Sequence, residues 1–336
     1  MPARVDCPAA AETVFLFSGQ GSQYFHMGRA LYDEDATFRE WMTRLDELAR
    51  RLSGHSVIDV LYSDAHAKGD RFDRTLLTHP AIFMVEYSLA QSLIQAGVNP
   101  DMVLGASLGS FTAAAVAGFL DVEAALAAVI RQAAALEEWG EPGGMLAILA
   151  KPALFSDSLL RDRSELAAID FDTHFIVSAR SRELGEIEES LKVRGVDIQR
   201  LPVSFPFHSR WIDRARIPFE SFMQSVRRAP GRLPLVCCCA AEVLSDIPDG
   251  YFWNVVRSPI RFQDTVARLE QLGAHRYIDV GPAGTLATFL KYALPAGTGS
   301  TVHSILTPYG WRRNPEGVSV SEMLTGMRSK TSSCSL

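Results

Sequence analysis

The stretch that decides the fold is VLGASLGSFTAAAVAG, residues 103–118. It begins with apolar, β-prone residues, reaches Gly105-Ala106-Ser107-Leu108-Gly109 and continues as an alanine-rich helix. The pattern G-x-S-x-G between a strand and a helix predicts a sharp turn that exposes a nucleophilic serine, Ser107. Glycines on both sides of the turn allow the strand and the helix to approach closely. The N–H of Leu108 is then expected at the helix N-terminus, where it can help to bind an oxyanion.

Length and composition indicate a globular protein with one large domain or two smaller ones. The chain has 336 residues, of which 47% are hydrophobic and 21% are charged. Its net charge of −6 gives no electrostatic support to nucleic-acid binding. It contains no apolar run of about eighteen residues, so we expect no membrane span. The first residues, MPARVDCPAAAE, lack the apolar segment of a secretion signal.

The cysteines point to a reducing compartment. There are five, and three of them are adjacent at Cys237-Cys238-Cys239. Adjacent cysteines in a β-like run suit buried thiols better than a disulfide framework, and they lack the spacing of metal ligands. We therefore expect a cytoplasmic protein without a metal site.

The order of expected elements is that of an α/β protein. A strand at 13–17 leads into the loop Ser18–Gln23, and helices follow near 27–32 and 35–52. The pair His79-Pro80 is expected to begin a helix that ends near Ala96, because proline suits a first helical turn. After the serine turn we expect helices at 122–138, 211–226, 251–257, 262–272 and 285–292, and strands at 235–240, 277–280 and 302–306.

The pattern changes between residues 144 and 204. Strands are expected at 145–149, 165–170, 174–178 and 196–203, with helices at 155–160 and 182–194. The order strand–helix–strand–strand–helix–strand is typical of a ferredoxin-like unit. We therefore predict a discontinuous large α/β domain, 12–143 and 205–306, a small inserted domain, 144–204, and a peripheral C-terminal tail, 307–336.

A serine nucleophile needs a base, and two of the eight histidines are candidates. His208 follows an expected strand on a proline-bearing loop and precedes a helix. His303 is the rival, because α/β-hydrolases place their histidine late in the chain, after an acid. That interpretation would combine Ser107 with Asp279 and His303. The surface-or-core interpretation is applied to His26, His55, His66, His174 and His275.

Eight motifs follow one another along the chain. They are FSGQGSQ with the following Met27-Gly28, THPAIFMVEYSLA (78–90), LGASLG (104–109), VAGFL (116–120), GGMLAIL (143–149), LPVSFPFHS (201–209), FWNVVRSPIRF (252–262) and DVGPAGTLATFL (279–290). Together they resemble the malonyl-CoA:acyl-carrier-protein transacylase family, over about residues 13–305. The resemblance implies a hydrolase-like large α/β domain with a short parallel sheet and an inserted ferredoxin-like small domain.

The resemblance also implies roles for individual residues. Ser107 matches the acyl-accepting nucleophile and His208 its general base, which favours His208 over His303. Ser258 matches the position whose main-chain carbonyl orients the base. Gln20 matches the residue that lines the oxyanion hole beside the Leu108 N–H. No cofactor is implied, because the acyl group arrives on the phosphopantetheine of an acyl carrier protein, the expected partner.

The sequence departs from malonyl-selective members where those proteins hold the malonyl carboxylate. They use an arginine on the second helix after the nucleophile, and an ungapped count places Gln132 there. Arg131 is its neighbour and would point about 100° away on a helix, although a shift of one residue would restore it. Taken at face value, a neutral glutamine leaves the carboxylate's lost hydration uncompensated.

Other departures change residues expected near the pocket and leave the catalytic residues in place. Ala106 replaces the usual histidine before the nucleophile, Ser110 replaces a glutamate after the turn, and His79 replaces a glutamine. We expect Gln132, His79, Phe207 and Ala106 to bind the substrate.

The pattern of departures resembles one subgroup, the second free-standing acyltransferase-like proteins of polyketide synthases that lack built-in acyltransferase domains. These are understood to hydrolyse stalled acyl groups from carrier proteins. The resemblance therefore implies an acyl-carrier-protein hydrolase. An acyltransferase that loads malonyl or another acyl group, and a non-catalytic carrier-binding protein, stay open as alternatives.

Overall fold

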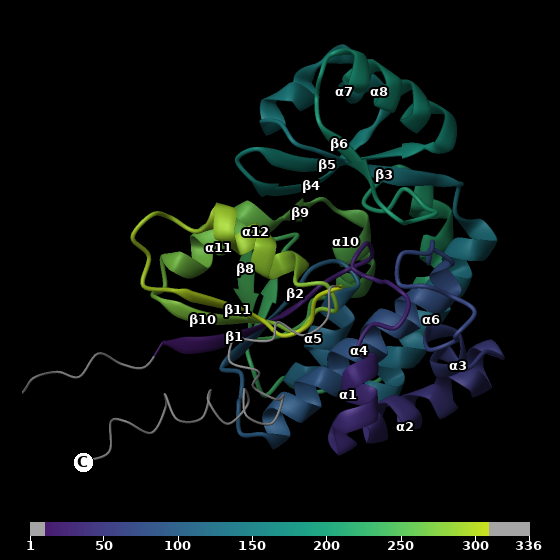
Figure 1. Ribbon diagram of the computed structural model, residues 1–336, viewed down its shortest axis with the longest axis vertical. Helices are drawn as coiled ribbons and strands as arrows, with labels where there is room; N and C mark the ends of the chain where they lie inside the picture. Colours follow the sequence, from purple (N-terminus) through teal and green to yellow (C-terminus); the bar gives the residue numbers. More distant parts are fainter. Residues whose placement is uncertain (1–10, 309–336) are drawn as a thin grey trace, which may run out of the picture.

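The computed structural model describes residues 11–308, and two β-sheets organise them (Figure 1). The larger sheet has the order β11-β10-β1-β2-β7-β8, and all its neighbours are parallel except β7 and β8. Its strands are β1 (Glu12–Phe17), β2 (Met102–Gly105), β7 (Leu235–Cys237), β8 (Glu242–Leu244), β10 (His275–Asp279) and β11 (Thr301–Ser304). Phe17 pairs with Gly105, so the loop after β1 and the serine turn after β2 leave the sheet side by side.

Most of the helices pack around this sheet. They are α1 (Arg29–Glu34), α2 (Ala36–Ser53), α3 (Val57–Leu61), α4 (Thr75–Gln95), α5 (Gly109–Ala117), α6 (Val122–Trp139), the 3₁₀ helix η2 (Arg210–Ala215), α9 (Arg216–Met223), α10 (Tyr251–Arg257), α11 (Phe262–Glu270) and α12 (Thr285–Ala293). Among residues 11–308, none of the helices combines the length and the apolar character that a bilayer crossing requires.

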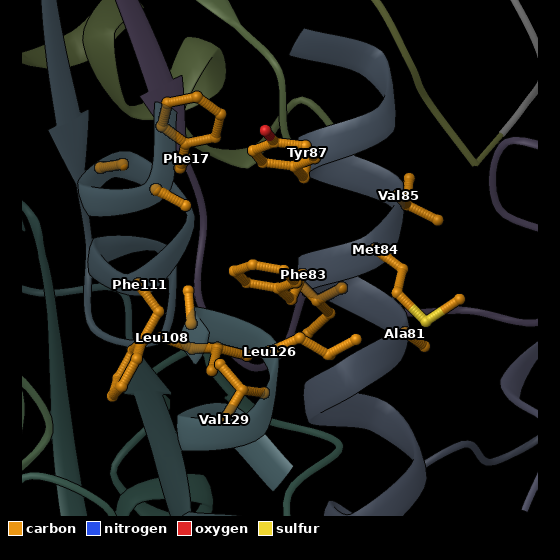
Figure 2. Close-up of a cluster of buried hydrophobic side chains, with 14 of the residues drawn as sticks. Phe17, Ala81, Phe83, Met84, Val85, Tyr87, Leu108, Phe111, Leu126 and Val129 are labelled. Carbon is orange, nitrogen blue, oxygen red and sulfur yellow. The ribbon is translucent and has the colours of Figure 1, made fainter. Parts of the chain in front are cut away.

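Helix α4 lies at the centre of the core. Figure 2 shows Phe83 and Tyr87 on one side of it, toward Phe111 of α5, and Val85 on the other side. A helix that is apolar on all sides must be buried, and α4 is buried along most of its length. One ionisable carboxyl, that of Glu86, is buried with it.

The expected start of α4 was wrong by four residues, since the helix begins at Thr75 and not at His79. Pro80 lacks an N–H and removes one helical hydrogen bond, so proline alone suggested a boundary there. The preceding turn forms nevertheless, because the N–H of Leu76 donates to the Glu137 carboxylate of α6 at 2.8 Å. A tertiary contact thus extends the helix beyond the start that Pro80 suggested.

The second sheet has the order β6-β3-β5-β4-β9. It contains β3 (Gly143–Ile148), β4 (Glu165–Phe171), β5 (His174–Arg180), β6 (Ile198–Arg200) and β9 (Ile260–Arg261), covered by η1 (Pro152–Ser156), α7 (Ser158–Arg163) and α8 (Ser181–Val193). The order β6-β3-β5-β4, all antiparallel, is the ferredoxin-like arrangement expected from the sequence. Figure 1 shows α7 and α8 on the face of this sheet that points away from the rest of the molecule.

The last strand of the second sheet, β9, comes from a segment assigned to the large domain. It pairs with β4 in parallel, with Ala168 opposite Ile260. A segment assigned to the large domain thus completes the second sheet. The domain boundaries stay a prediction, and residues 309–336 of the expected tail lie outside the described residues.

Two further expectations were wrong in detail. The single helix expected at 211–226 is divided into η2 and α9. The strand expected at 235–240 ends at Cys237, because the chain turns back and the Ala241 N–H donates to the Cys237 carbonyl at 2.8 Å. Cys237, Cys238 and Cys239 are free thiols, and only the first lies in a strand.

Candidate active site

The turn after β2 holds Ser107 in a strained conformation. Its φ angle is 55°, in the left-handed region that non-glycine residues avoid. A Cβ atom at Gly105 would lie 2.4 Å from the Cα of Ser110, and one at Gly109 would lie 2.1 Å from the carbonyl oxygen of Phe17. Any side chain at these two positions would collide with backbone, which confirms the close approach predicted from the G-x-S-x-G pattern.

His208 meets the serine from a loop that precedes η2. Its Nε2 lies 2.9 Å from Ser107 Oγ, and its Nδ1 lies 2.6 Å from the carbonyl oxygen of Ser258. A carbonyl can only accept a hydrogen bond, so Nδ1 carries the proton in the neutral ring. The Nε2 lone pair then faces the serine hydroxyl. The main-chain N–H of His208 donates to Val256, so the end of α10 holds both the backbone and the ring.

The environment of His208 keeps the imidazole neutral. Burial lowers the pKa of His208 to about 4, against a smaller opposing effect of the Ser258 carbonyl, and the positive charge of Arg257 lowers it further. A neutral ring near pH 7 is free to accept a proton from Ser107.

The alternative acid and base are engaged elsewhere. The two carboxylate oxygens of Asp279 accept hydrogen bonds from the N–H groups of Gly281 and Ala287, both at 2.8 Å. Asp279 thus stabilises the turn that begins α12. His303 lies on β11, opposite Ile278 of β10. The hydroxyl of Ser107 contacts His208, as the motif resemblance predicted.

The main-chain N–H groups of Leu108 and Gln20 donate to no main-chain carbonyl among residues 11–308. Leu108 follows Ser107 directly, and Gln20 lies in the loop after β1. The side-chain amide of Gln20 donates to Thr78 Oγ1 at 2.6 Å, so this side chain is tied to α4. A Cβ at Gly19 would lie 3.0 Å from the Ala106 carbonyl and 3.6 Å from the Leu108 nitrogen, so the loop packs directly on the turn. Unpaired main-chain donors are the groups that an oxyanion requires.

A pocket of about 250 Å³ opens beside Ser107, between the two sheets. The loop after β1 forms one wall, Met145 and Ile176 of the second sheet form another, and Phe289 of α12 forms a third. Of the predicted substrate-binding residues, Ala106 and Phe207 line this pocket. His79 and Gln132 do not line it, and both side chains are buried.

His79 and Gln132 are nonetheless unusual. The ring of His79 lies 5.6 Å from that of Phe207, and burial lowers the pKa of His79 to about 3, so the ring is uncharged. Neither ring nitrogen of His79 and neither amide atom of Gln132 has a hydrogen-bond partner among the described residues. Arg131 is exposed, and its guanidinium lies 5.8 Å from the ring of Phe222, on α9.

Sequence reasoning missed two polar groups near the pocket. His174 lines the pocket, and its Nδ1 lies 2.8 Å from the buried carboxylate of Asp170. Glu86 reaches from α4 to the loop after β1, where its carboxyl accepts a hydrogen bond from the Ser18 N–H at 2.7 Å. A carboxylate inside the apolar run IFMVEYSLA was the available signal, since a buried charge requires a partner.

Comparisons with known proteins agree with this fold. The family described as acyl transferase domain matches residues 14–331. The polyketide biosynthesis acyltransferase homolog BaeD of Bacillus velezensis is 42% identical over 297 residues, which cover 88% of this chain and 92% of that protein. The homolog PksD of Bacillus subtilis is 41% identical over 297 residues, which cover 88% of this chain and 92% of that protein. A loading acyltransferase from the avermectin modular polyketide synthase superposes with a TM-score of 0.84 at 25% identity, covering 95% of this chain and 99% of that one.

Proposed function

Since this chain belongs to the acyl transferase domain family, we propose that it is an acyl-carrier-protein hydrolase of polyketide biosynthesis. The enzyme takes an acyl group from the phosphopantetheine thioester of a carrier protein onto Ser107 and releases it to water. The relatives BaeD and PksD support the pathway, because both are named as polyketide biosynthesis proteins. The phosphopantetheine of the carrier protein is the only prosthetic group in this reaction.

Acylation begins with proton transfer from Ser107 to Nε2 of His208, across the 2.9 Å contact. The serine oxygen attacks the thioester carbon, and the negative charge forms on the carbonyl oxygen. The free N–H groups of Leu108 and Gln20 stabilise this oxyanion, and one such donor typically contributes about 3–4 kcal/mol. The carrier thiol then leaves and takes the proton from His208.

Deacylation repeats these steps with water. His208 removes a proton from a water molecule, which attacks the ester carbon of acyl-Ser107, and the serine oxygen leaves with that proton. The products are a free carboxylic acid and an unloaded carrier. A transferase differs in its second acceptor, a carrier thiol in place of water.

The observation that carries the hydrolase proposal is that neither an arginine nor a lysine lines the described pocket beside Ser107, while position 132 holds an uncharged, buried glutamine. A malonyl carboxylate in this pocket would lose its hydration without meeting a cation, whereas an arginine would bind it bidentately. An unpaired buried charge costs several kcal/mol, so a malonyl group is disfavoured against an uncharged acyl group. The neighbouring Arg131 packs on Phe222 at the surface. These features favour removal of uncharged acyl groups over malonyl loading.

The test compares carrier proteins loaded with acetyl, butyryl or malonyl groups. We expect the enzyme to release free acid and unloaded carrier from the acetyl and butyryl forms much faster than from the malonyl form. Ser107→Ala is the control and should abolish release. A protein that ignores the uncharged acyl groups and forms malonyl-Ser107 would instead be a loading transferase.

A further inference from the structure

A buried carboxyl connects the loop after β1 with the helix of the serine turn. Glu86 is fully buried on α4, and its Oε1 lies 2.7 Å from the Ser18 nitrogen and 2.9 Å from Ser18 Oγ. Its other oxygen, Oε2, accepts a hydrogen bond from Thr112 Oγ1 of α5 at 3.0 Å. Glu86 thus holds together three segments that meet at Ser107.

The contacts continue from Ser18 to the loop that carries Gln20. Ser18 Oγ lies 3.0 Å from Ser22 Oγ, and Ser22 Oγ donates to the carbonyl oxygen of Gly19 at 2.8 Å. Ser18 and Ser22 are both buried. The chain of oxygen–oxygen contacts therefore runs from Glu86 through two hydroxyls to Gly19.

Counting hydrogens along this chain shows that it is one hydrogen short. A hydroxyl has one hydrogen to donate, and a main-chain carbonyl has none. Ser22 must give its hydrogen to the Gly19 carbonyl, so the one hydrogen of Ser18 lies toward either Ser22 or Glu86. A hydrogen on the Glu86 carboxyl completes both contacts at once.

We propose that Glu86 is a protonated carboxylic acid at neutral pH and that the relay Glu86–Ser18–Ser22 orients the Gly19–Gln20 peptide. The carbonyl of Gly19 and the N–H of Gln20 belong to one planar trans peptide unit and point in opposite directions. The hydrogen bond from Ser22 to this carbonyl thereby fixes where the Gln20 N–H points. The positioning residues for the oxyanion donor are Glu86, Ser18 and Ser22. This role rests on the proposed function.

The surroundings of Glu86 agree with the hydrogen count. Burial raises its pKa well above the ordinary value, and this effect exceeds the opposing effect of the hydrogen bonds from Ser18 and Thr112. Asp279 of β10 is the ionisable group that acts on Glu86, and its charge raises the pKa further. Hydrogen bonds in a chain also polarise one another, so the relay strengthens the Gln20 N–H as a donor.

Infrared difference spectra of the wild-type protein and Glu86→Gln at pH 7 test the protonation. Glutamine has nearly the same shape, and its amide is neutral. We expect the wild type to show a carboxylic acid C=O band that the variant lacks. Absence of this band from the wild type would overturn the proposal. If Glu86→Gln does not fold, Thr112→Val should shift the same band to higher frequency, because it removes the partner of Oε2, and an unshifted spectrum would count against the relay.

Kinetics test the positioning role. We expect Ser22→Ala to slow single-turnover acylation of Ser107 by about tenfold to a hundredfold with KM nearly unchanged, because the lost orientation acts on the oxyanion. Ser22→Thr keeps the hydroxyl and should restore the rate. Ser92→Ala is the matched control, since it removes a buried hydroxyl whose partners are the Ser88 carbonyl on α4 and the Asp35 carboxylate at the start of α2. An unchanged rate in Ser22→Ala would overturn the positioning role.

The two proposals fail in different ways. The infrared measurement needs no substrate, so its outcome is independent of the reaction. A wild-type protein that forms no acyl-Ser107 from any loaded carrier would refute the proposed function, while a protonated Glu86 would still be seen. Acylation by the wild type with no acid band would refute the relay alone.

Discussion

The Nδ1 atom of His208 lies 2.6 Å from the main-chain carbonyl oxygen of Ser258. The base is therefore oriented by a neutral group, where a Ser-His-Asp triad uses a carboxylate. A carbonyl fixes the tautomer of the ring but supplies no full negative charge to stabilise the imidazolium. Burial lowers the pKa of His208 to about 4, and the Ser258 carbonyl opposes this effect only in part.

Substitution of Ser258 should have little effect, because the acceptor belongs to the main chain. We expect Ser258→Ala to keep kcat within about threefold of the wild type, whereas His208→Ala should reduce it by about four orders of magnitude or more. Both are measured as release of butyrate from a loaded carrier. Asp279→Asn distinguishes the alternative triad: a loss of kcat as large as that of His208→Ala, in a folded variant, would contradict the role given to His208.

The pH dependence should have its acid limb near pH 4. The pKa of His208 is lowered to about 4, so the ring is neutral and able to accept a proton above that pH and becomes charged below it. We expect kcat/KM to be constant from about pH 5 to 7 and to fall as the pH decreases through 4. A limb near the ordinary histidine value of about 6.5 would show that the free enzyme exposes the ring to water.

An arginine at position 132 should change the preferred acyl group. Gln132→Arg places a cation at the position that the family resemblance assigns to the malonyl-binding arginine, so we expect more malonyl-Ser107 after incubation with malonyl-CoA and slower release of butyrate. Intact-protein mass spectrometry measures the adduct. Arg131→Gln is the matched control and should leave both rates unchanged, because Arg131 packs on Phe222. A loss of malonyl occupancy in that control would indicate that Arg131 reaches the pocket.

Two glycine-to-alanine substitutions should have opposite effects. Gly109→Ala places a Cβ 2.1 Å from the Phe17 carbonyl oxygen and should lower the free energy of unfolding by several kcal/mol. Gly185 is exposed on α8, and a Cβ there would have no atom within 4 Å. Gly185→Ala should therefore raise the free energy of unfolding by about 0.5–1 kcal/mol. Chemical denaturation measures both. Equal stabilities would mean that the contact between α5 and β1 is looser than described.

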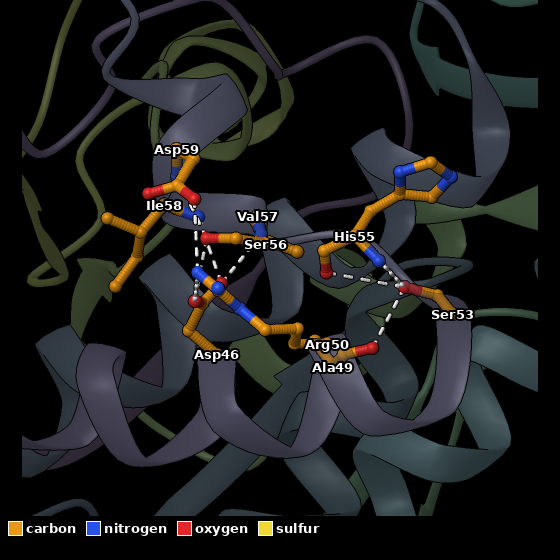
Figure 3. Close-up of polar contacts among 9 residues, drawn as sticks. All are labelled: Asp46, Ala49, Arg50, Ser53, His55, Ser56, Val57, Ile58 and Asp59. Carbon is orange, nitrogen blue, oxygen red and sulfur yellow. Dashed lines mark hydrogen bonds and ion pairs between the residues drawn. The ribbon is translucent and has the colours of Figure 1, made fainter.

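Asp46 holds the start of α3, as Figure 3 shows. Its buried carboxylate accepts hydrogen bonds from the N–H groups of Val57 and Ile58 and from Ser56 Oγ. We expect Asp46→Ala to lower the free energy of unfolding by about 2–3 kcal/mol with kcat unchanged. Asp59→Ala is the control, because this carboxylate is 72% exposed in its ion pair with Arg50 and should matter little.

The parts of the site that the sequence could predict are those with a local signal. Ser107 stands in a pattern whose glycines are required by backbone contacts, and His208 stands in an ordered motif on a proline-bearing loop. The order of elements was enough for the ferredoxin-like sheet. Strand β9 has two residues and no periodicity, so its pairing with β4 appears only in three dimensions.

The remaining features depend on tertiary contacts between distant segments. The relay from Glu86 joins residues 68 positions apart, and it exists because the parallel pairing of β1 and β2 brings the loop beside the serine turn. Motif alignment places His79 and Gln132 at the substrate, whereas in the structure neither lines the pocket beside Ser107. Helix α4 begins early because Glu137 of α6 accepts a hydrogen bond from its first turn.

The central claim is that acyl-Ser107 passes its acyl group to water. The most direct measurement incubates the enzyme with a butyryl-loaded carrier and an excess of a second, unloaded carrier of different mass, and follows both carriers by intact-protein mass spectrometry. We predict that the first carrier loses its butyryl group while the second stays unloaded and free butyrate accumulates. Rapid appearance of the butyryl group on the second carrier would contradict the account and identify a transferase.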